Sequence, residues 1–534
     1  MFPIPLGLRR AARPARSTEG SRSVTPAGEG LQYQLERREP MVERPSPGRA
    51  VPPPAEPARG IRHHSPYAGT WFPDDPATLS RLLDETWARS HRRTSAYLTP
   101  GAVAFVVPHA GLVYSGAVAA AAYRHMEQQR PERVVILGFC HRGSLPGLWI
   151  PEVGQYETPL GRLGVDADCV AFLLEDPLFR RTPESRVCDH SIEIQLPLLY
   201  RAAPSATLVP VYVAALDSDQ RAQAAERLAR CAGPRTVFLA SSDLTHFGSS
   251  FGYRPFPVDA RTEQRLRDLD FEVIDAAGSL SEGLFLDTIR RTSATVCGSD
   301  PISLLLAVLR GLDGDDEIFQ NTLDYQTSGE ITGDFHHSVS YGALGYFPWS
   351  AFRLGPEEQA QLLRLARETL SEYLSTGRRE RRSHAAPPAN LPALTSQLAV
   401  FVSLHSKGQL RGCLGRNTTD ESLWRTVPDL ALAAATEDRR FPPLSPGEED
   451  IEIEISVLSP MKRIEDRGAF RVNEHGALLE AGGRHGLLLP QVATERNWGA
   501  EQFFEALARK ANVSPSVYAD PSTRLHVFRA QIIH

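Results

Sequence analysis

The sequence is poor in cysteine, in lysine and in long apolar runs, and these shortages exclude several classes of protein. Its 534 residues contain six scattered cysteines and no Cys-x-x-Cys pair, which argues against a secreted disulfide framework and favours a reducing, cytoplasmic location. No apolar run is long enough to span a membrane, so we expect no membrane partner. The net charge of -6, without a basic block, argues against a nucleic-acid partner.

Composition divides the chain into three regions. Residues 1–59 are rich in proline and arginine, so we expect a disordered tail that cannot bury enough apolar surface to fold. The arginines that precede Glu19 also give this tail a faint resemblance to a transit peptide. The chain as a whole is 42% hydrophobic and 23% charged, as in globular proteins. We place a first domain at 60–354 and a second at 355–534.

The first domain alternates apolar strands with helical segments, which is the pattern of βαβ units. We therefore predict an α/β fold with a parallel or mixed sheet. Strands are expected at 102–107, 134–138, 236–240 and 339–347. Helices are expected at 78–89, from 115 onward, and at 192–201, 219–231, 260–268 and 299–310.

The second, smaller domain mixes strands with separate helices, which indicates an α+β fold. Residues 451–458 include an Ile-Glu-Ile-Glu-Ile alternation that is typical of a sheet with one wet face. Further strands are expected at 398–404 and 525–533, and helices at 357–375 and 501–511.

Chemistry-bearing side chains follow three of the predicted buried strands. Pro108 ends the first strand because it cannot donate to a ladder, and His109 comes next. The second strand is followed by His141, and the third by Asp243 and His246. Ligands bind at the carboxyl ends of strands in open α/β sheets, so we expect these histidines to converge there.

His109, His141 and Cys297 are the candidate metal ligands, because neutral imidazole and thiolate both suit Fe(II), copper or zinc. Cys297 precedes a predicted helix, with Ser299 as its cap and Pro301 in its first turn, and the helix dipole favours a thiolate there. Two alternatives stay open: a buried cysteine is often a small hydrophobe, and a strand-end histidine is often a hydrogen-bonded core group.

Two further clusters are candidates. His246 could move protons or add a ligand while Asp243 fixes its tautomer, although Asp243 could equally form an Asx turn. Ser191 is expected to cap the following helix, which places His190 and Glu193 near its N-terminus in either a capping or a chemical role.

The first domain contains five motifs in order: Pro-His-Ala-Gly at 108–111, Ile-Leu-Gly-x-x-His at 136–141, His-Ser-Ile-Glu at 190–193, Ser-Ser-Asp-x-x-His at 241–246 and Thr-Val-Cys-Gly at 295–298. With these motifs the domain resembles the Memo (mediator of cell motility) family. The resemblance implies a fold similar to the class III extradiol dioxygenases, where two histidines and a carboxylate hold Fe(II).

The same resemblance implies roles for individual residues. Iron or copper would bind the two strand-end histidines and Cys297, while His246 would occupy the acid/base position with Asp243 nearby. Cys297 stands in place of the carboxylate, which shifts the metal preference toward softer copper. Arg142 stands where many relatives have a second histidine.

The second domain contains four motifs: Leu-Arg-Gly-Cys-Leu-Gly at 410–415, Arg-Phe-Pro-Pro-Leu at 440–444, Ile-Glu-Ile-Ser-Val-Leu-Ser-Pro at 453–460 and Gly-Leu-Leu-Leu-Pro at 486–490. With these motifs the domain resembles the family named for the AMME-syndrome chromosomal region. Gly412 and Gly415 predict a tight turn that exposes Arg411 and Cys413, where the arginine would favour a thiolate or bind an anion. Alternatively, Cys413 is a core cysteine in a rigid turn.

In prokaryotes the two domain types occur together, fused or beside a radical SAM protein, which implies a shared pathway and such a partner (the AmmeMemoRadiSam system).

Two functions compete. One is a non-haem iron or copper, dioxygenase-like oxidoreductase acting on an unknown small molecule or peptide, which the retained His246 and Asp243 favour. The other is a non-catalytic iron- or copper-binding or peptide-binding scaffold, which the Cys297 ligand favours. No Gly-x-Ser-x-Gly elbow follows a strand, which disfavours a serine hydrolase.

Overall fold

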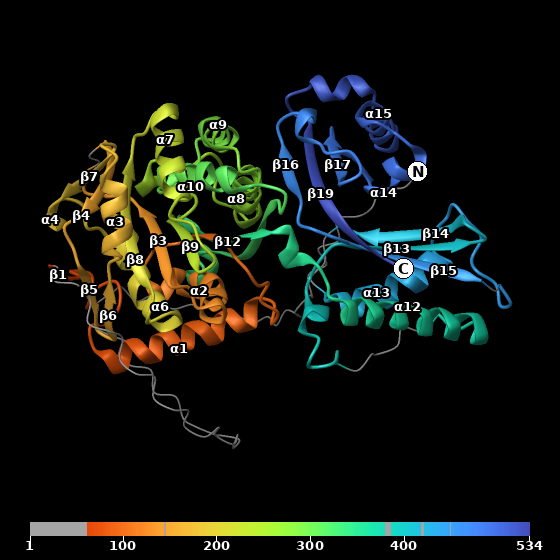
Figure 1. Cartoon of the computed structure of the whole chain (residues 1–534), viewed down its shortest axis with the longest axis horizontal. Coiled ribbons are helices and arrows are strands. Elements are labelled where there is room, and N and C mark those ends of the chain that lie inside the picture. The colour runs from red at the N-terminus through yellow and green to blue at the C-terminus, as the bar shows by residue number, and fades with distance from the viewer. Residues whose placement is uncertain (1–60, 144–145, 380–385, 418–420, 449) are drawn as a thin grey trace, which may run out of the picture. The chain divides into compact units, whose positions relative to one another are not determined.

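The computed structural model of the protein describes residues 61–143, 146–379, 386–417, 421–448 and 450–534, so the tail expected at 1–59 lies outside it. The first domain is built on a mixed sheet with helices on both faces (Figure 1). The strand order is β10 (His246–Gly248), β12 (His337–Pro348), β2 (Ala104–Val107), β9 (Thr236–Ser241), β3 (Arg133–Gly138), β8 (Thr207–Ala214), β4 (Gly147–Pro151) and β7 (Phe179–Thr182), with β11 (Ile318–Thr327) paired to β12.

The three strands that precede the candidate residues are neighbours in this sheet. β2 pairs with β9, and β9 with β3, and both pairings are parallel. Their carboxyl ends therefore share one edge, as the sequence predicted. β12 and β4 run antiparallel to β2 and β8, which makes the sheet mixed and confirms the α/β fold class.

Alternating side chains of the central strands pack into two separate cores. In β2, Ala104 and Val106 belong to one core, and Phe105 and Val107 to the other. The first core is covered by α3 (Ala167–Leu174), α7 (Ser218–Ala229), α8 (Thr262–Gly278), α9 (Glu282–Thr292) and α10 (Ser299–Leu312). The second is covered by α1 (Pro76–Arg93), α2 (Leu112–Gln129), α5 (His190–Glu193) and α6 (Gln195–Ala202). Burial on both faces explains why these strands read as unbroken apolar runs.

Some helix boundaries differ from the prediction. α2 begins at Leu112 rather than at 115, and the helix expected at 192–201 is divided into α5 and α6. α9 was not predicted. The first domain also contains a small sheet of β1 (Arg62–His64), β5 (Gln155–Thr158) and β6 (Gly161–Gly164), and the short helices α4 (Glu184–Val187) and α11 (Ser328–Thr332).

The second domain has an antiparallel sheet, which confirms the α+β prediction. Its order is β14 (Gln409–Arg416), β13 (Val400–Ser406), β15 (Ile451–Leu458), β19 (Arg524–Ile533), β17 (His475–Ala481) and β18 (Arg484–Leu488), and β16 (Lys462–Ile464) pairs with β19. Its helices are α12 (Pro356–Thr376), α13 (Leu423–Thr436), α14 (Gln491–Arg496) and α15 (Ala500–Lys510). In the described ranges, no helix combines the length and the apolar character needed to cross a membrane.

The tight turn predicted at Gly412 and Gly415 is wrong, because both residues lie within the edge strand β14. A Cβ atom at Gly412 would collide with the carbonyl oxygen of Ala434 in α13, and one at Gly415 would collide with the ring of Phe401. The glycines therefore serve close packing against α13 and β13, and the sequence pattern alone does not distinguish that use of glycine from a turn.

Candidate metal centre

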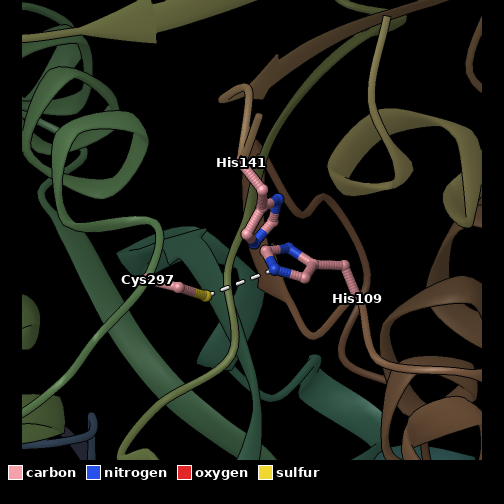
Figure 2. A group of neighbouring side chains, drawn as sticks. All are labelled: His109, His141 and Cys297. Carbon is pink, nitrogen blue, oxygen red and sulfur yellow. Dashed lines mark hydrogen bonds between the residues drawn. The ribbon is translucent and has the colours of Figure 1, made fainter. Parts of the chain in front are cut away.

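His109, His141 and Cys297 lie together beyond the carboxyl edge of the sheet. His109 follows β2, His141 follows β3, and Cys297 precedes Gly298, the N-cap of α10. Figure 2 shows the three side chains pointing toward one another. One ligand atom from each lies within 4.8 Å of the other two. The structure thus brings together the three residues that the sequence singled out as ligands.

The hydrogen bonds of His109 fix which ring nitrogen is free. Ser241 donates its single hydroxyl proton to the carbonyl oxygen of Ser191, so its Oγ must accept from Nδ1 of His109, 3.1 Å away. Nε2 of His109 therefore carries a lone pair, and it lies 3.2 Å from Sγ of Cys297 (Figure 2). Burial lowers the pKa of His109 to about 3, and His141 works in the same direction, so the ring is neutral at pH 7.

Asp189 orients His141. Its carboxylate accepts from Nδ1 of His141 at 2.8 Å and from the backbone N–H of the same residue at 3.1 Å, which leaves Nε2 of His141 free. Asp189 is fully buried. Burial raises its pKa, but the hydrogen bond from His141 and the charge of His190 outweigh that effect and lower it. A carboxylate behind a histidine ring is the usual partner of a metal-binding imidazole.

Cys297 Sγ accepts a hydrogen bond from the backbone N–H of Asp243 at 3.3 Å. Burial raises the pKa of this thiol, and the Asp243 carboxylate adds to the effect, so the helix dipole does not by itself create a thiolate here. Ser299 does not cap α10: Gly298 is the N-cap, and its N–H is satisfied by Oγ of Ser242 at 2.9 Å. Pro301 lies in the first turn, as predicted.

Asp243 lies on the loop between β9 and β10, His246 is the first residue of β10, and the ligand atoms of both form a second group with Cys297. Oδ1 of Asp243 accepts from the backbone N–H groups of His109 at 2.8 Å and Ala110 at 3.3 Å, which ties the β2 and β9 loops together. His246 donates from Nδ1 to the carbonyl oxygen of Thr295 at 3.0 Å, so Thr295, and not Asp243 as predicted, fixes its tautomer and Nε2 is the proton-accepting nitrogen.

The candidates His190 and Glu193 have different surroundings. The ring of His190 stacks on that of His141, with centroids 3.9 Å apart. Glu193 is instead paired with Nε2 of His63 at 3.0 Å, and it groups with His63 and Cys188 rather than with the candidate ligands. The predicted cap at Ser191 is wrong: Asp189 caps α5, because Oγ of Ser191 donates to the carbonyl oxygen of Phe139.

A cavity of about 750 Å³ opens over these groups. His109, His141, His190, Asp243 and His246 line its polar side. Its apolar side includes Trp71, Phe72, Val113, Tyr114 and Phe251. An apolar pocket with a few convergent polar groups is the usual form of a small-molecule or peptide site.

The candidates of the second domain are held by other contacts. Arg411 donates to both carboxylate oxygens of Glu448, at 3.1 and 2.9 Å, and to the carbonyl oxygen of Pro442 at 2.6 Å. Cys413 donates its backbone N–H to Asp438 at 2.8 Å and is half-buried in β14. These contacts explain Arg411 as a group that ties β14 to the 442–448 loop.

Sequence reasoning named no role for Asp189, Ser241 or Gln195, which orient the two histidines. Gln195 donates to the carbonyl oxygen of Pro108 and to Oγ of Ser241, both at 3.0 Å. The signal that was available is their position, since Asp189 and Gln195 flank the His-Ser-Ile-Glu motif and Ser241 is the last residue of β9.

Fold and cluster together define a mixed α/β protein with a candidate metal centre at the carboxyl edge of its sheet. Residues 62–345 match the family model for Memo-like proteins, and residues 363–533 match that for AMMECR1. The chain belongs to the Memo-like protein family and carries an AMMECR1 domain C-terminal to its Memo domain.

Individual proteins are similar to parts of the chain. The chain is 31% identical over 294 residues to protein MEMO1 of Xenopus laevis, which covers 53% of this chain and 97% of that protein. It is 39% identical over 189 residues to a protein of Methanothermobacter thermautotrophicus, covering 34% of this chain and 96% of the relative. A solved structure of an uncharacterized protein from Pyrococcus horikoshii is 34% identical and covers 34% of this chain and 92% of that chain, with a TM-score of 0.31.

Proposed function

We propose that this chain is a metal-dependent oxidoreductase that holds Fe(II) or copper on His109, His141 and Cys297. The observation that carries the proposal is the convergence of one ligand atom from each residue within 4.8 Å, beside a cavity of about 750 Å³. The substrate would be a small molecule or a peptide in that cavity.

The donor set fits such a metal. Two imidazole nitrogens have their lone pairs left free by the hydrogen bonds on the opposite ring nitrogens. Imidazole and sulfur donors suit iron and copper, and the sulfur favours Cu(I). A bound redox metal supplies the electron transfer that side chains lack.

His246 would move the proton. Its Nδ1 is occupied by Thr295, so Nε2 is available to take a proton from a substrate and return it. The ring lines the cavity together with Asp243. Asp243 would hold the loops of His109 and His246 in register through its bonds to the backbone after β2.

The AMMECR1 match supports a role for the second domain and for a partner protein in this activity. We infer that the second domain presents or modifies the substrate and that a radical SAM protein is a partner, in the cytoplasm. The scarcity of cysteine supports the cytoplasmic location.

The rim of the cavity favours a second candidate, a non-catalytic metal- or peptide-binding scaffold. Val113, Tyr114 and Phe251 remain 52%, 43% and 41% exposed there. Exposed apolar groups around a pocket are typical of a surface that binds a peptide.

Metal analysis after anaerobic purification tests the proposal. We expect about one iron or copper per chain, lost in His109→Ala and kept in the control His125→Ala, which removes another buried imidazole of the same domain. Metal retained in His109→Ala at the wild-type level would contradict the proposal. His246→Ala then separates the two functions, because an oxidoreductase loses oxygen consumption with metal still bound, whereas a scaffold shows no turnover in either form.

A further inference from the structure

Cys169 and Cys231 form a buried pair of thiols that the proposed function does not use. Cys169 lies in the first turn of α3, and Cys231 follows the end of α7. The two side chains belong to the same apolar core and are 5% and 4% exposed. Their sulfurs lie 2.8 Å apart, although the residues are 62 positions apart in the sequence.

The backbone on both sides of the pair is held in place. The N–H of Cys169 donates to Oδ1 of Asp166, the N-cap of α3, at 2.9 Å. The guanidinium of Arg133 connects the two segments, because its Nε donates to Oδ2 of Asp166 at 2.7 Å and its Nη1 to the carbonyl oxygen of Cys231 at 3.2 Å. Arg133, from β3, therefore holds the two cysteine segments in fixed positions relative to each other.

This arrangement suits a covalent bond between the sulfurs. Bonded sulfurs lie about 2.05 Å apart, so closing the bond needs a movement of less than about 1 Å. Two other cysteines of the first domain have different neighbours: Sγ of Cys188 lies 3.9 Å from the hydroxyl of Tyr156, and Sγ of Cys297 lies beside His109.

We propose that Cys169 and Cys231 are a redox pair that forms an intramolecular disulfide when hydrogen peroxide oxidises them. The inference does not depend on the metal centre, since neither cysteine is among the candidate ligands. The bond would join α3 to α7 and make the first domain more stable.

The chemistry balances in two steps. The thiolate of Cys231 attacks one peroxide oxygen, the O–O bond breaks, and hydroxide leaves to be protonated to water, giving a sulfenic acid. The sulfur of Cys169 then attacks the sulfur of that sulfenic acid, the S–O bond breaks, and a second water leaves. The two thiols lose two electrons and two protons to one hydrogen peroxide.

The contacts favour Cys231 as the attacking group. The thiol of Cys169 donates a hydrogen bond to Sγ of Cys231, which lowers the pKa of Cys231, and the positive charge of Arg133 works in the same direction against the effect of burial.

The test uses the full chain. The protein is first reduced, the reductant is then removed, and a chelator removes any metal. It is then exposed to hydrogen peroxide. Free thiols are alkylated in denaturant, and the digest is examined by mass spectrometry. We expect one pair of peptides, containing Cys169 and Cys231, to be linked and to separate on reduction, while Cys188 in the same sample is alkylated. The oxidised wild type should unfold roughly 5 °C higher than the reduced form.

Two variants keep the test decisive. Cys169→Ser should leave Cys231 as a sulfenic acid that dimedone traps, with no linked peptide and no rise in unfolding temperature. Cys231→Ser should show neither the link nor the rise. Recovery of Cys169 and Cys231 as free thiols to the same extent as Cys188, or a link from either to a different cysteine, would overturn the proposal.

Discussion

The carboxyl edge of the sheet in the first domain and the edge strand β14 in the AMMECR1 domain resemble each other in sequence, since each carries glycine and cysteine beside a polar residue. In the structure they differ in whether their polar side chains keep a nitrogen that is available to bind a ligand. His109 and His141 use Nδ1 for hydrogen bonds to Ser241 and Asp189, and both rings keep the lone pair on Nε2, which in His109 faces Sγ of Cys297. The guanidinium of Arg411 instead donates hydrogen bonds to Glu448 and to the carbonyl oxygen of Pro442. The stronger candidate site is therefore the one whose side chains keep free lone pairs, and a conspicuous sequence motif alone does not identify it.

The largest effect is expected at Glu193, which belongs to a site motif but is paired with His63. His63→Ala leaves this fully buried carboxylate unpaired, so we expect a loss of about 4 kcal/mol in the free energy of unfolding. Metal content should not change. The control is His64→Ala, because the side chain of His64 is 75% exposed and should contribute less than about 1 kcal/mol. Equal stability of the two variants in denaturant titrations would contradict the structural role of Glu193.

The same pair predicts a pH dependence. Burial lowers the pKa of His63, but the hydrogen bonds and charges of Glu193 and Glu184 outweigh burial, so the pKa is raised above 6.5. This stabilisation is therefore complete below pH 6.5 and is lost as the pH rises through the folded-state pKa. Unfolding measured from pH 5 to 9 should show this decline in the wild type and not in His63→Ala.

Adding a methyl group at Gly412 tests whether the glycines of β14 serve close packing. Gly412→Ala places a Cβ against the carbonyl oxygen of Ala434, where backbone must move, and we expect a destabilisation of about 3 kcal/mol. Gly311→Ala, in α10, has open space around the new atom and should change stability by less than about 1 kcal/mol. If Gly412→Ala unfolds like the wild type in calorimetry, the glycines of this motif do not serve close packing.

Asp189→Asn removes the negative charge behind His141. Outer partners of metal-bound histidines typically change affinity by roughly 10- to 100-fold, so metal competition with a chelator should show a loss of that size. Asp217→Asn, which alters a helix N-cap on α7, is the control and should bind metal normally. Unchanged affinity in Asp189→Asn would mean that the carboxylate only caps α5.

The smallest effect is expected at Arg411. Its side chain is 18% exposed and that of Glu448 is 30% exposed, so Arg411→Ala should destabilise the second domain by about 1 kcal/mol. Metal content and oxygen consumption should stay at wild-type levels. A loss of activity without a loss of stability would instead make β14 part of the functional site.

Local patterns predicted the elements that matter most for the candidate site. The apolar runs before His109, His141 and Asp243 became β2, β3 and β9, because strands buried on both faces need apolar residues throughout. Periodicity could not show that α5 and α6 are separate, nor that β14 is a strand, since glycine permits both a turn and close packing. It also could not pair Cys169 with Cys231, because their contact depends on the packing of α3 against the end of α7.

X-ray absorption at the metal edge of the anaerobically loaded protein tests the central claim most directly. We expect one sulfur and at least two imidazole ligands in the wild type, and loss of the sulfur contribution in Cys297→Ser with the imidazoles retained. A wild-type spectrum without sulfur, or a sulfur contribution that persists in Cys297→Ser, would show that the metal binds elsewhere.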